Sequence, residues 1–113
     1  MSAMHDDFKP KLVFPDLEFL MPGISMRTIG FNEFNLSPPF TLIYFEIQPQ
    51  HATPLDQHEE KECWIVLKGG GILHYEMDHT RICAQDMLFF APFKKHQVVN
   101  DSNELLGIVS IYW

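Results

Sequence analysis

Short runs of β-forming residues, each closed by a turn signal, recur along most of this chain. Residues 40–47 are rich in aromatic and β-branched side chains and stop before Pro49, and residues 62–67 end at three consecutive glycines, residues 69–71. The pattern repeats at a spacing of roughly eight to twelve residues up to a last run, residues 105–113. No segment carries apolar residues at a 3.6-residue period over a dozen positions, which argues against long amphipathic helices. The sequence therefore predicts an all-β domain, a small antiparallel sandwich or barrel.

Further strands are expected between these runs, at residues 24–31, 72–77, 80–84, 87–90 and 97–100. Three consecutive glycines permit the positive φ angles of a tight turn. We therefore expect the run before the glycines and the run after them to pair as a hairpin. Asp78 and His79 are expected to form the next turn.

The first 23 residues differ from the rest because prolines interrupt them. Pro10, Pro15 and Pro22 limit any secondary structure there to short extended pieces. The segment nevertheless carries too many large apolar side chains for a free tail. We predict an arm at residues 1–23 that packs on the barrel or on a neighbouring subunit, followed by one barrel domain at residues 24–113. Because sheet edges need cover and the arm can add a strand to a second copy, we expect a homodimer.

Composition excludes several classes of function. The chain has 113 residues, 46% of them hydrophobic, which supports one folded domain and no second. Fifteen acidic against eight basic residues leave a net charge of −7, which argues against nucleic-acid binding because that binding depends on cationic contacts to phosphates. No apolar stretch approaches the roughly 20 residues of a membrane span, and the N-terminus does not resemble a signal peptide. Cys63 and Cys83 are too few for a disulfide framework, so we expect a cytoplasmic protein.

Histidines and carboxylates that could bind a metal lie in two separate parts of the sequence. His58 and Glu62 are four residues apart, which would separate them by roughly 13 Å in one continuous strand. Ligands must lie within roughly 2.0–2.2 Å of a shared ion, so both can serve only if the charged residues between them form a turn. Asp56 lies two residues before His58 and shares its face. His96 can complete the set from a distant strand.

These residues resemble the two signature motifs of the cupin superfamily. Six positions match in order and spacing, as His58-x3-Glu62-x6-Gly69 in the first motif and Pro92-x3-His96-x3-Asn100 in the second. The resemblance covers about residues 40–113 and implies a single-domain cupin, a small antiparallel double-stranded β-helix or jelly-roll barrel. In the family, three histidines and one glutamate hold a metal ion in the mouth of the barrel.

The chain departs from the family pattern at the metal. Asp56 stands where the first motif has its leading histidine, and two motif glycines are replaced. The resemblance supports His58, Glu62 and His96 as ligands, and leaves Asp56 as a fourth ligand, a partner of a ligand or a general base. Such a set suits one divalent transition-metal ion, and zinc, iron, manganese and nickel remain open.

Each of these residues also has a purely structural interpretation. His58 and Glu62 can form the solvated, acidic end of a hairpin, and Asp56 can be an ordinary turn residue. Trp64 shares the face of Glu62 and is a candidate pocket wall, although core packing is the simpler explanation. Cys63 alternates away from the site and is predicted to be a small buried hydrophobe.

The residues and the resemblance together favour a metal-dependent enzyme that acts on a small metabolite. The metal would polarise a substrate oxygen or nitrogen, or bind O₂ if it is iron. Asp56 is the candidate catalytic base. The alternative is a non-catalytic cupin that binds a small molecule as a sensor or carrier, and metal content and turnover separate the two.

A narrower resemblance concerns two segments next to the proposed site. Residues 54–58 with Glu62-x-Trp64, and the closing residues 110–113, are similar to the cupin component of bacterial hydrazine-forming synthetases. There a zinc-bound cupin rearranges an ester formed between an N-hydroxylated lysine and an amino acid. The resemblance implies this reaction class as a further alternative.

Overall fold

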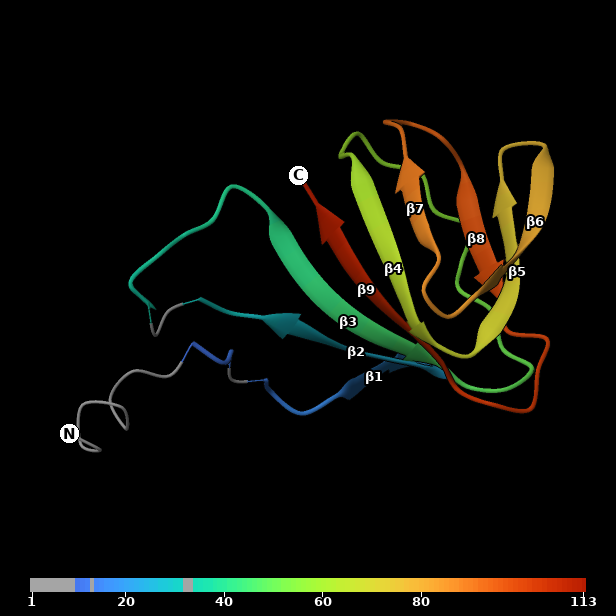
Figure 1. The fold of residues 1–113 in the computed structure, drawn as a ribbon. Coiled ribbons are helices and arrows are strands. Elements are labelled where there is room, and N and C mark those ends of the chain that lie inside the picture. The colour runs from blue at the N-terminus through green and yellow to red at the C-terminus, as the bar shows by residue number, and fades with distance from the viewer. Residues whose placement is uncertain (1–9, 13, 32–33) are drawn as a thin grey trace.

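The computed structural model describes residues 10–12, 14–31 and 34–113, and these residues form nine strands (Figure 1). The strands are β1 (Glu18–Met21), β2 (Ile24–Ile29), β3 (Thr41–Ile47), β4 (Glu62–Lys68), β5 (Gly70–Tyr75), β6 (Asp78–Cys83), β7 (Met87–Phe90), β8 (His96–Val99) and β9 (Leu106–Tyr112). Within the described ranges, no helix has the length and apolar character needed to cross a membrane. The prediction of an all-β fold is confirmed.

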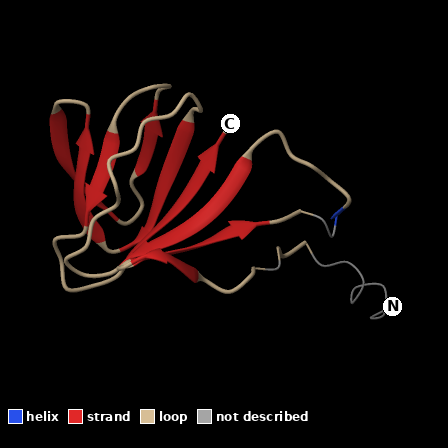
Figure 2. Cartoon of the chain, turned by 180° about the vertical axis from the view of Figure 1, so that it is seen from behind, coloured by secondary structure: helices blue, strands red, loops and turns tan. Residues whose placement is uncertain are grey.

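The strands form two sheets that face each other. Six strands pair in the order β1-β2-β3-β9-β4-β7 and three in the order β6-β5-β8, and every pair of neighbours is antiparallel. The last strand, β9, lies between β3 and β4, so neighbours in the larger sheet come from distant parts of the sequence. Figures 1 and 2 show the two sheets as opposite walls, with β2 and β3 extending to one side. This arrangement is the predicted antiparallel jelly-roll barrel.

Alternation along each strand places the core between the sheets. In β4, Glu62, Trp64 and Val66 point inward and are buried, whereas Cys63 and Ile65 between them are half-buried on the opposite side. Both sheets contribute to the buried apolar cluster, with Ile47, Leu106 and Ile108 from the larger sheet and Leu73, Ile82 and Val98 from the smaller. Each such side chain contributes about 1.5–3 kcal/mol by burial, so the closed core holds the two walls together.

The predicted hairpin at the three glycines is wrong. Strands β4 and β5 follow each other directly, but β5 pairs with β6 and β8 in the other sheet. Gly69 has a φ of 78°, and a Cβ there would collide with the carbonyl oxygen of Leu105. The glycines therefore carry the chain across from one sheet to the other. The tight hairpin comes next and turns at Glu76 and Met77, just before the predicted Asp78-His79 turn.

The segment predicted as an arm contributes a strand to the larger sheet. Strand β1 pairs with β2, and all four of its residues are exposed. Upstream of β1, Leu12 and Phe14 border a cavity of about 370 Å³ against β2 and β3. Residues 1–9 lie outside the described residues. The division into an arm at residues 1–23 and a barrel at residues 24–113 stays a prediction.

Candidate metal centre

The four residues predicted as metal ligands converge at one end of the barrel. Asp56 and His58 lie in the loop before β4, Glu62 is the first residue of β4, and His96 is the first residue of β8. Asp56 and His96 exchange two backbone hydrogen bonds of 2.9 Å, which fix the loop to β8. The residues between His58 and Glu62 form the bend that their spacing requires.

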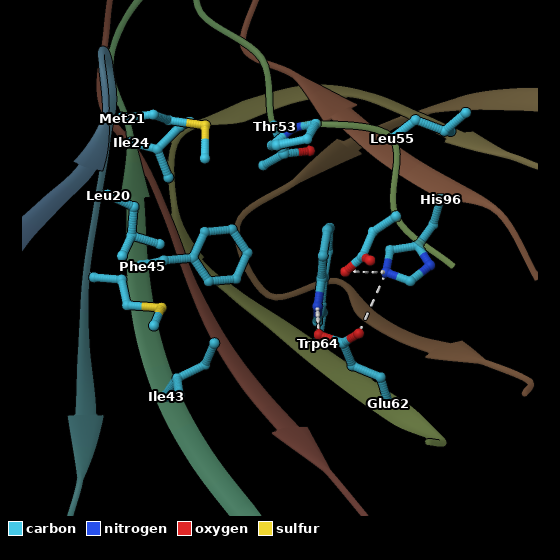
Figure 3. Close-up of a pocket in the computed structure, with 13 residues that line it drawn as sticks. Leu20, Met21, Ile24, Ile43, Phe45, Thr53, Leu55, Glu62, Trp64 and His96 are labelled. Carbon is cyan, nitrogen blue, oxygen red and sulfur yellow. Dashed lines mark hydrogen bonds and ion pairs between the residues drawn. The ribbon is translucent and has the colours of Figure 1, made fainter. Parts of the chain in front are cut away.

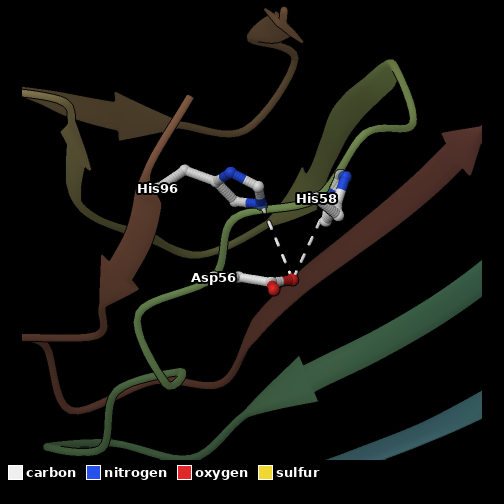
Figure 4. A group of neighbouring side chains, drawn as sticks. All are labelled: Asp56, His58 and His96. Carbon is white, nitrogen blue, oxygen red and sulfur yellow. Dashed lines mark ion pairs between the residues drawn. The ribbon is translucent and has the colours of Figure 1, made fainter. Parts of the chain in front are cut away.

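Nitrogen and oxygen atoms of these side chains point at a common centre. Glu62 Oε1 lies 2.9 Å from His58 Nε2 and 3.3 Å from His96 Nε2. Asp56 Oδ2 lies 3.8 Å from His58 Nε2 and 3.9 Å from His96 Nε2 (Figure 4). Ligand atoms of Asp56, His58 and His96 all lie within 4.8 Å of one another. Ligands of one ion at about 2.0–2.2 Å are spaced by about 3.0–3.5 Å, so small side-chain movements bring this set to coordination distances.

Backbone carbonyls determine which nitrogen of each histidine faces the centre. His58 Nδ1 lies 3.0 Å from the carbonyl oxygen of Glu60, and His96 Nδ1 lies 3.1 Å from that of Lys94. A carbonyl oxygen only accepts, so both Nδ1 atoms donate and each neutral ring presents its Nε2 lone pair to Glu62. Two lone pairs that face a carboxylate repel it. The centre therefore requires positive charge, which extra protons on the imidazoles or a divalent metal ion can supply.

Glu62 is a buried carboxylate held by several donors. Its Oε2 accepts hydrogen bonds from Trp64 Nε1, at 2.6 Å, and from Ser110 Oγ. Burial is the largest influence on its pKa and raises it, but the hydrogen bonds from His96, Ser110 and Trp64 together lower the pKa to about 2. Glu62 is therefore ionised at neutral pH and available as a ligand.

His96 is also fixed in position, by burial, by stacking on a neighbouring ring and by Glu62. Its side chain is buried, and its ring stacks on Phe90 with ring centroids 4.6 Å apart. Burial is the largest influence on the pKa of His96 and lowers it, but the hydrogen bond and charge of Glu62, aided by the Lys94 carbonyl, raise the pKa above its ordinary value. The raised pKa means that His96 holds its second proton more tightly than a free imidazole does. A metal ion that binds to its Nε2 must displace that proton.

A cavity of about 290 Å³ opens beside three of the four residues (Figure 3). Asp56, Glu62 and His96 form its polar end. Its other walls are apolar and include Trp64, Phe45 and residues of β1 and β2. Trp64 is both buried in the core and part of the cavity wall, so its two interpretations are compatible.

A second, more polar hollow of about 300 Å³ lies against His58 and Tyr112. Asp56 and Glu62 border both this hollow and the apolar cavity. The side chain of Asp56 is 61% exposed. Its Oδ1 accepts a hydrogen bond from the backbone N–H of Gln57 at 2.9 Å, which leaves Oδ2 directed toward the histidines.

One residue that supports the site escaped the sequence analysis. Ser110 donates to Glu62 from β9, and the available signal was a lone hydroxyl among the apolar inward residues of the last strand.

Asn100, which matches the second motif, lies outside the site, after the end of β8 opposite His96. It is fully buried, and its Nδ2 donates to the carbonyl oxygens of Ile47 and Glu104, which anchors the loop after β8. Cys63 faces away from the site and is half-buried.

The fold and site define a small two-sheet barrel with histidine and carboxylate side chains converging at one end. A family model described as a cupin domain matches residues 43–112, more than half of the chain. The chain therefore belongs to the cupin family, as its motifs suggested.

Solved structures show the same architecture. A Cupin 2 conserved barrel domain protein from Salinispora arenicola aligns with a TM-score of 0.77 at 22% identity, over 87% of this chain and 81% of that chain. KdgF from a Halomonas species aligns with a TM-score of 0.74 at 17% identity, over 87% and 86%. The polyketide cyclase RemF from Streptomyces resistomycificus aligns with a TM-score of 0.74 at 19% identity, over 86% and 72%. At these identities the likeness concerns the fold.

Proposed function

We propose that this cupin binds one divalent transition-metal ion through His58, Glu62 and His96 and acts on a small metabolite in the adjoining cavity. One observation carries the proposal: two histidine Nε2 atoms, fixed by backbone carbonyls, converge on one oxygen of an ionised, buried glutamate. The ion, when bound, would supply Lewis acidity toward a substrate oxygen or nitrogen. RemF, a polyketide cyclase, is an enzyme with the same fold, which supports a catalytic role.

The volume of the cavity and the distribution of its apolar and polar walls indicate the class of substrate. Its volume of about 290 Å³ is at the small end of ligand pockets. Phe45, Ile24 and Met26 offer apolar walls, while the polar groups gather at one end. A small molecule with an apolar body and one oxygen- or nitrogen-bearing head group fits this distribution. The body would pack on the walls and exclude water, with its head group placed beside Asp56 and Glu62.

Asp56 is the candidate for moving a proton. Its Oδ2 lies 3.8–3.9 Å from both histidine nitrogens, beyond hydrogen-bond distance, and its side chain borders the cavity. In this position Oδ2 can accept a proton from a substrate head group. A shift of less than about 1 Å would instead bring it to ligand spacing. Asp56→Asn separates the roles: metal retained with turnover lost indicates a base, and metal lost indicates a ligand.

Elemental analysis of the untagged protein tests the metal site. We expect about one equivalent of a transition metal in the parent, and loss of that metal in His58→Ala and in His96→Ala. His74→Ala serves as the control, because His74 lies on β5 beside His79 and outside the centre. A parent that stays free of zinc, iron, manganese and nickel after incubation with each would overturn the metal site. A thermal shift with a metabolite that is never turned over would favour the non-catalytic binding protein.

One observation favours the hydrazine-forming alternative. The residues that carry that resemblance include Trp64 and Ser110, and both donate hydrogen bonds to Glu62. Incubation of the zinc-loaded protein with an ester of an N-hydroxylated lysine and an amino acid tests it. A rearranged product of unchanged mass, which appears with the parent and not with Glu62→Gln, would support this reaction class. Recovery of the ester or of its hydrolysis products alone would count against it.

A further inference from the structure

A cavity of about 210 Å³ is bordered by the free edges of both sheets. Strand β7 ends the larger sheet and β6 ends the smaller one, so each pairs on one side only. We call this space the edge cavity. Its lining comes from β5, β6 and β7 and includes Leu73, Tyr75, Asp78, Thr80, Leu88 and Phe90. Among the described residues, no side chain lines both the edge cavity and the cavity of about 290 Å³ beside the metal centre.

The edge cavity has an apolar floor and a polar rim. Leu73 is 4% exposed and Phe90 is 2% exposed, and Tyr75 and Leu88 beside them are half-buried. The rim is formed by exposed residues of β6, among them Asp78 and Thr80. An apolar cavity of about 150 Å³ in another protein is large enough to bind benzene. The edge cavity therefore has room for one aromatic ring.

The charge at the rim favours a cationic ligand. Asp78 lies opposite Tyr75 in the register of β5 and β6. The carboxylate of Glu76 is paired with Lys94 Nζ at 3.7 Å, whereas Asp78 forms no ion pair with the residues that the structure describes. A chain of net charge −7 also attracts cations from solution. An ammonium group at the rim would lie beside the Asp78 carboxylate and above aromatic rings, which attract cations through their faces.

Phe90 connects the edge cavity with the metal centre. In the strand registers Phe90 lies opposite Glu62, and Tyr75 lies opposite His96. The Phe90 ring stacks on that of His96 with centroids 4.6 Å apart, and it meets the Trp64 ring edge-on at 4.7 Å. Trp64 and His96 line the cavity beside the metal centre (Figure 3). A molecule in the edge cavity would therefore touch the ring on which His96 packs.

We propose that the edge cavity is a second binding site, which takes a small aromatic amine and acts as an effector site for the metal centre. The aromatic ring would pack on Leu73, Leu88 and Phe90, with the ammonium group at Asp78. A ligand that restricts the Phe90 ring also restricts His96, so less conformational entropy is lost when a metal ion then binds. This coupling is reciprocal, so the metal must raise the affinity for the amine by the same factor. The effector role rests on the proposed function, whereas binding in the edge cavity does not.

An NMR titration of the metal-free, untagged chain with phenethylamine tests the site. We expect shifts of the Thr80 amide, of the His96 ring and of the Ala91 amide, which donates to Tyr75 Oη at 3.1 Å. Thr80→Trp fills the edge cavity and should abolish these shifts. Thr28→Trp is the matched control, because Thr28 is also exposed within a strand but lies on β2, away from the cavity. Circular dichroism verifies that both variants keep the fold.

A second variant tests the charge of the rim. Asp78→Asn should weaken phenethylamine binding about two- to fivefold, the range of an exposed ion pair. The same variant should leave the affinity for 2-phenylethanol unchanged, because the alcohol carries the same ring without the charge. Equal effects on the two molecules, or no effect on either, would overturn the preference for a cation.

Zinc affinity, measured in competition with a chromophoric chelator, tests the effector role. We expect saturating phenethylamine to tighten zinc binding at least about fivefold in the parent, and to have no effect in Thr80→Trp. Failure of phenethylamine to bind, or shifts that persist in Thr80→Trp, would overturn the site. Binding of the amine with unchanged zinc affinity would overturn the effector role. A chain that binds no zinc would overturn that role together with the proposed function, while the NMR shifts would still decide whether the edge cavity binds the amine.

Discussion

Replacement of Ser110 by alanine tests how the buried carboxylate of the site is held. Ser110 is fully buried, and its hydroxyl is one of two donors to Glu62 Oε2, the other being Trp64 Nε1. A hydrogen bond to a charged group contributes about 1.5–3 kcal/mol. We therefore expect the free energy of unfolding of metal-free Ser110→Ala to be about 2 kcal/mol below that of the parent at neutral pH.

The same substitution should change the acid dependence of stability. The pKa of Glu62 is lowered from 4.5 to about 2 in the folded protein. Its contribution to stability is therefore complete above pH 4.5 and is lost as the pH falls toward 2. At 1.36 kcal/mol per pKa unit, the full contribution is about 3 kcal/mol. Loss of the Ser110 donor raises the folded pKa, so the stability gap between parent and variant should narrow as the pH falls through this range.

Urea unfolding in the presence of a chelator, followed by tryptophan fluorescence from about pH 7 to about pH 3, measures both effects. Ser37→Ala is the control, because Ser37 is exposed in the loop before β3. The control should match the parent at every pH. A gap below about 0.5 kcal/mol at neutral pH would be no larger than an ordinary surface change. Such a gap, or one that stays constant as the pH falls, would refute the account of Glu62.

Three further outcomes are expected. Trp64→Phe removes the indole donor to the Glu62 carboxylate but keeps an aromatic ring. It should weaken zinc binding about tenfold or more in a calorimetric titration. Unchanged affinity would contradict the role given to the indole. Gly71→Ala should lower the melting temperature, because its Cβ would collide with the carbonyl oxygen of Val99. Gly30→Ala has nothing within 4 Å of its Cβ and should be neutral. Competition with a chromophoric chelator should show zinc affinity rising about tenfold per pH unit for each proton displaced from the site histidines, and a flat profile would indicate other ligands.

The sequence predicted the strands and the alternation of side chains in residues 62–67, because both depend on residues that are neighbours in sequence. Alternation in residues 62–67 already indicated that Glu62 and Trp64 share a face and that Cys63 points away, and the structure shows both. The spacing of His58 and Glu62 required a bend between them, and the bend is present. These inferences need only the two-residue period of a strand and the geometry of one chain segment.

The sequence did not predict in the same way which strands pair. The three glycines suit a tight turn, yet they carry the chain to the other sheet, because β4 finds its neighbours in β7 and β9. Ser110 lies 48 residues from Glu62 and reaches it only because β9 pairs with β4. No local pattern specifies which distant strand becomes a neighbour, since that choice depends on burial summed over the whole core.

The sequence by itself determined the all-β class, the shared face of Glu62 and Trp64 opposite Cys63, and the residue types that could bind a metal. Tertiary structure alone decided the distances at which Asp56, His58, Glu62 and His96 meet, the support that Trp64 and Ser110 give the glutamate, and the cavity that opens beside them. The physical reason is range. Strand alternation and turn formation depend on neighbours in sequence, whereas a site assembled from a loop and three strands requires the two sheets to close around a common core.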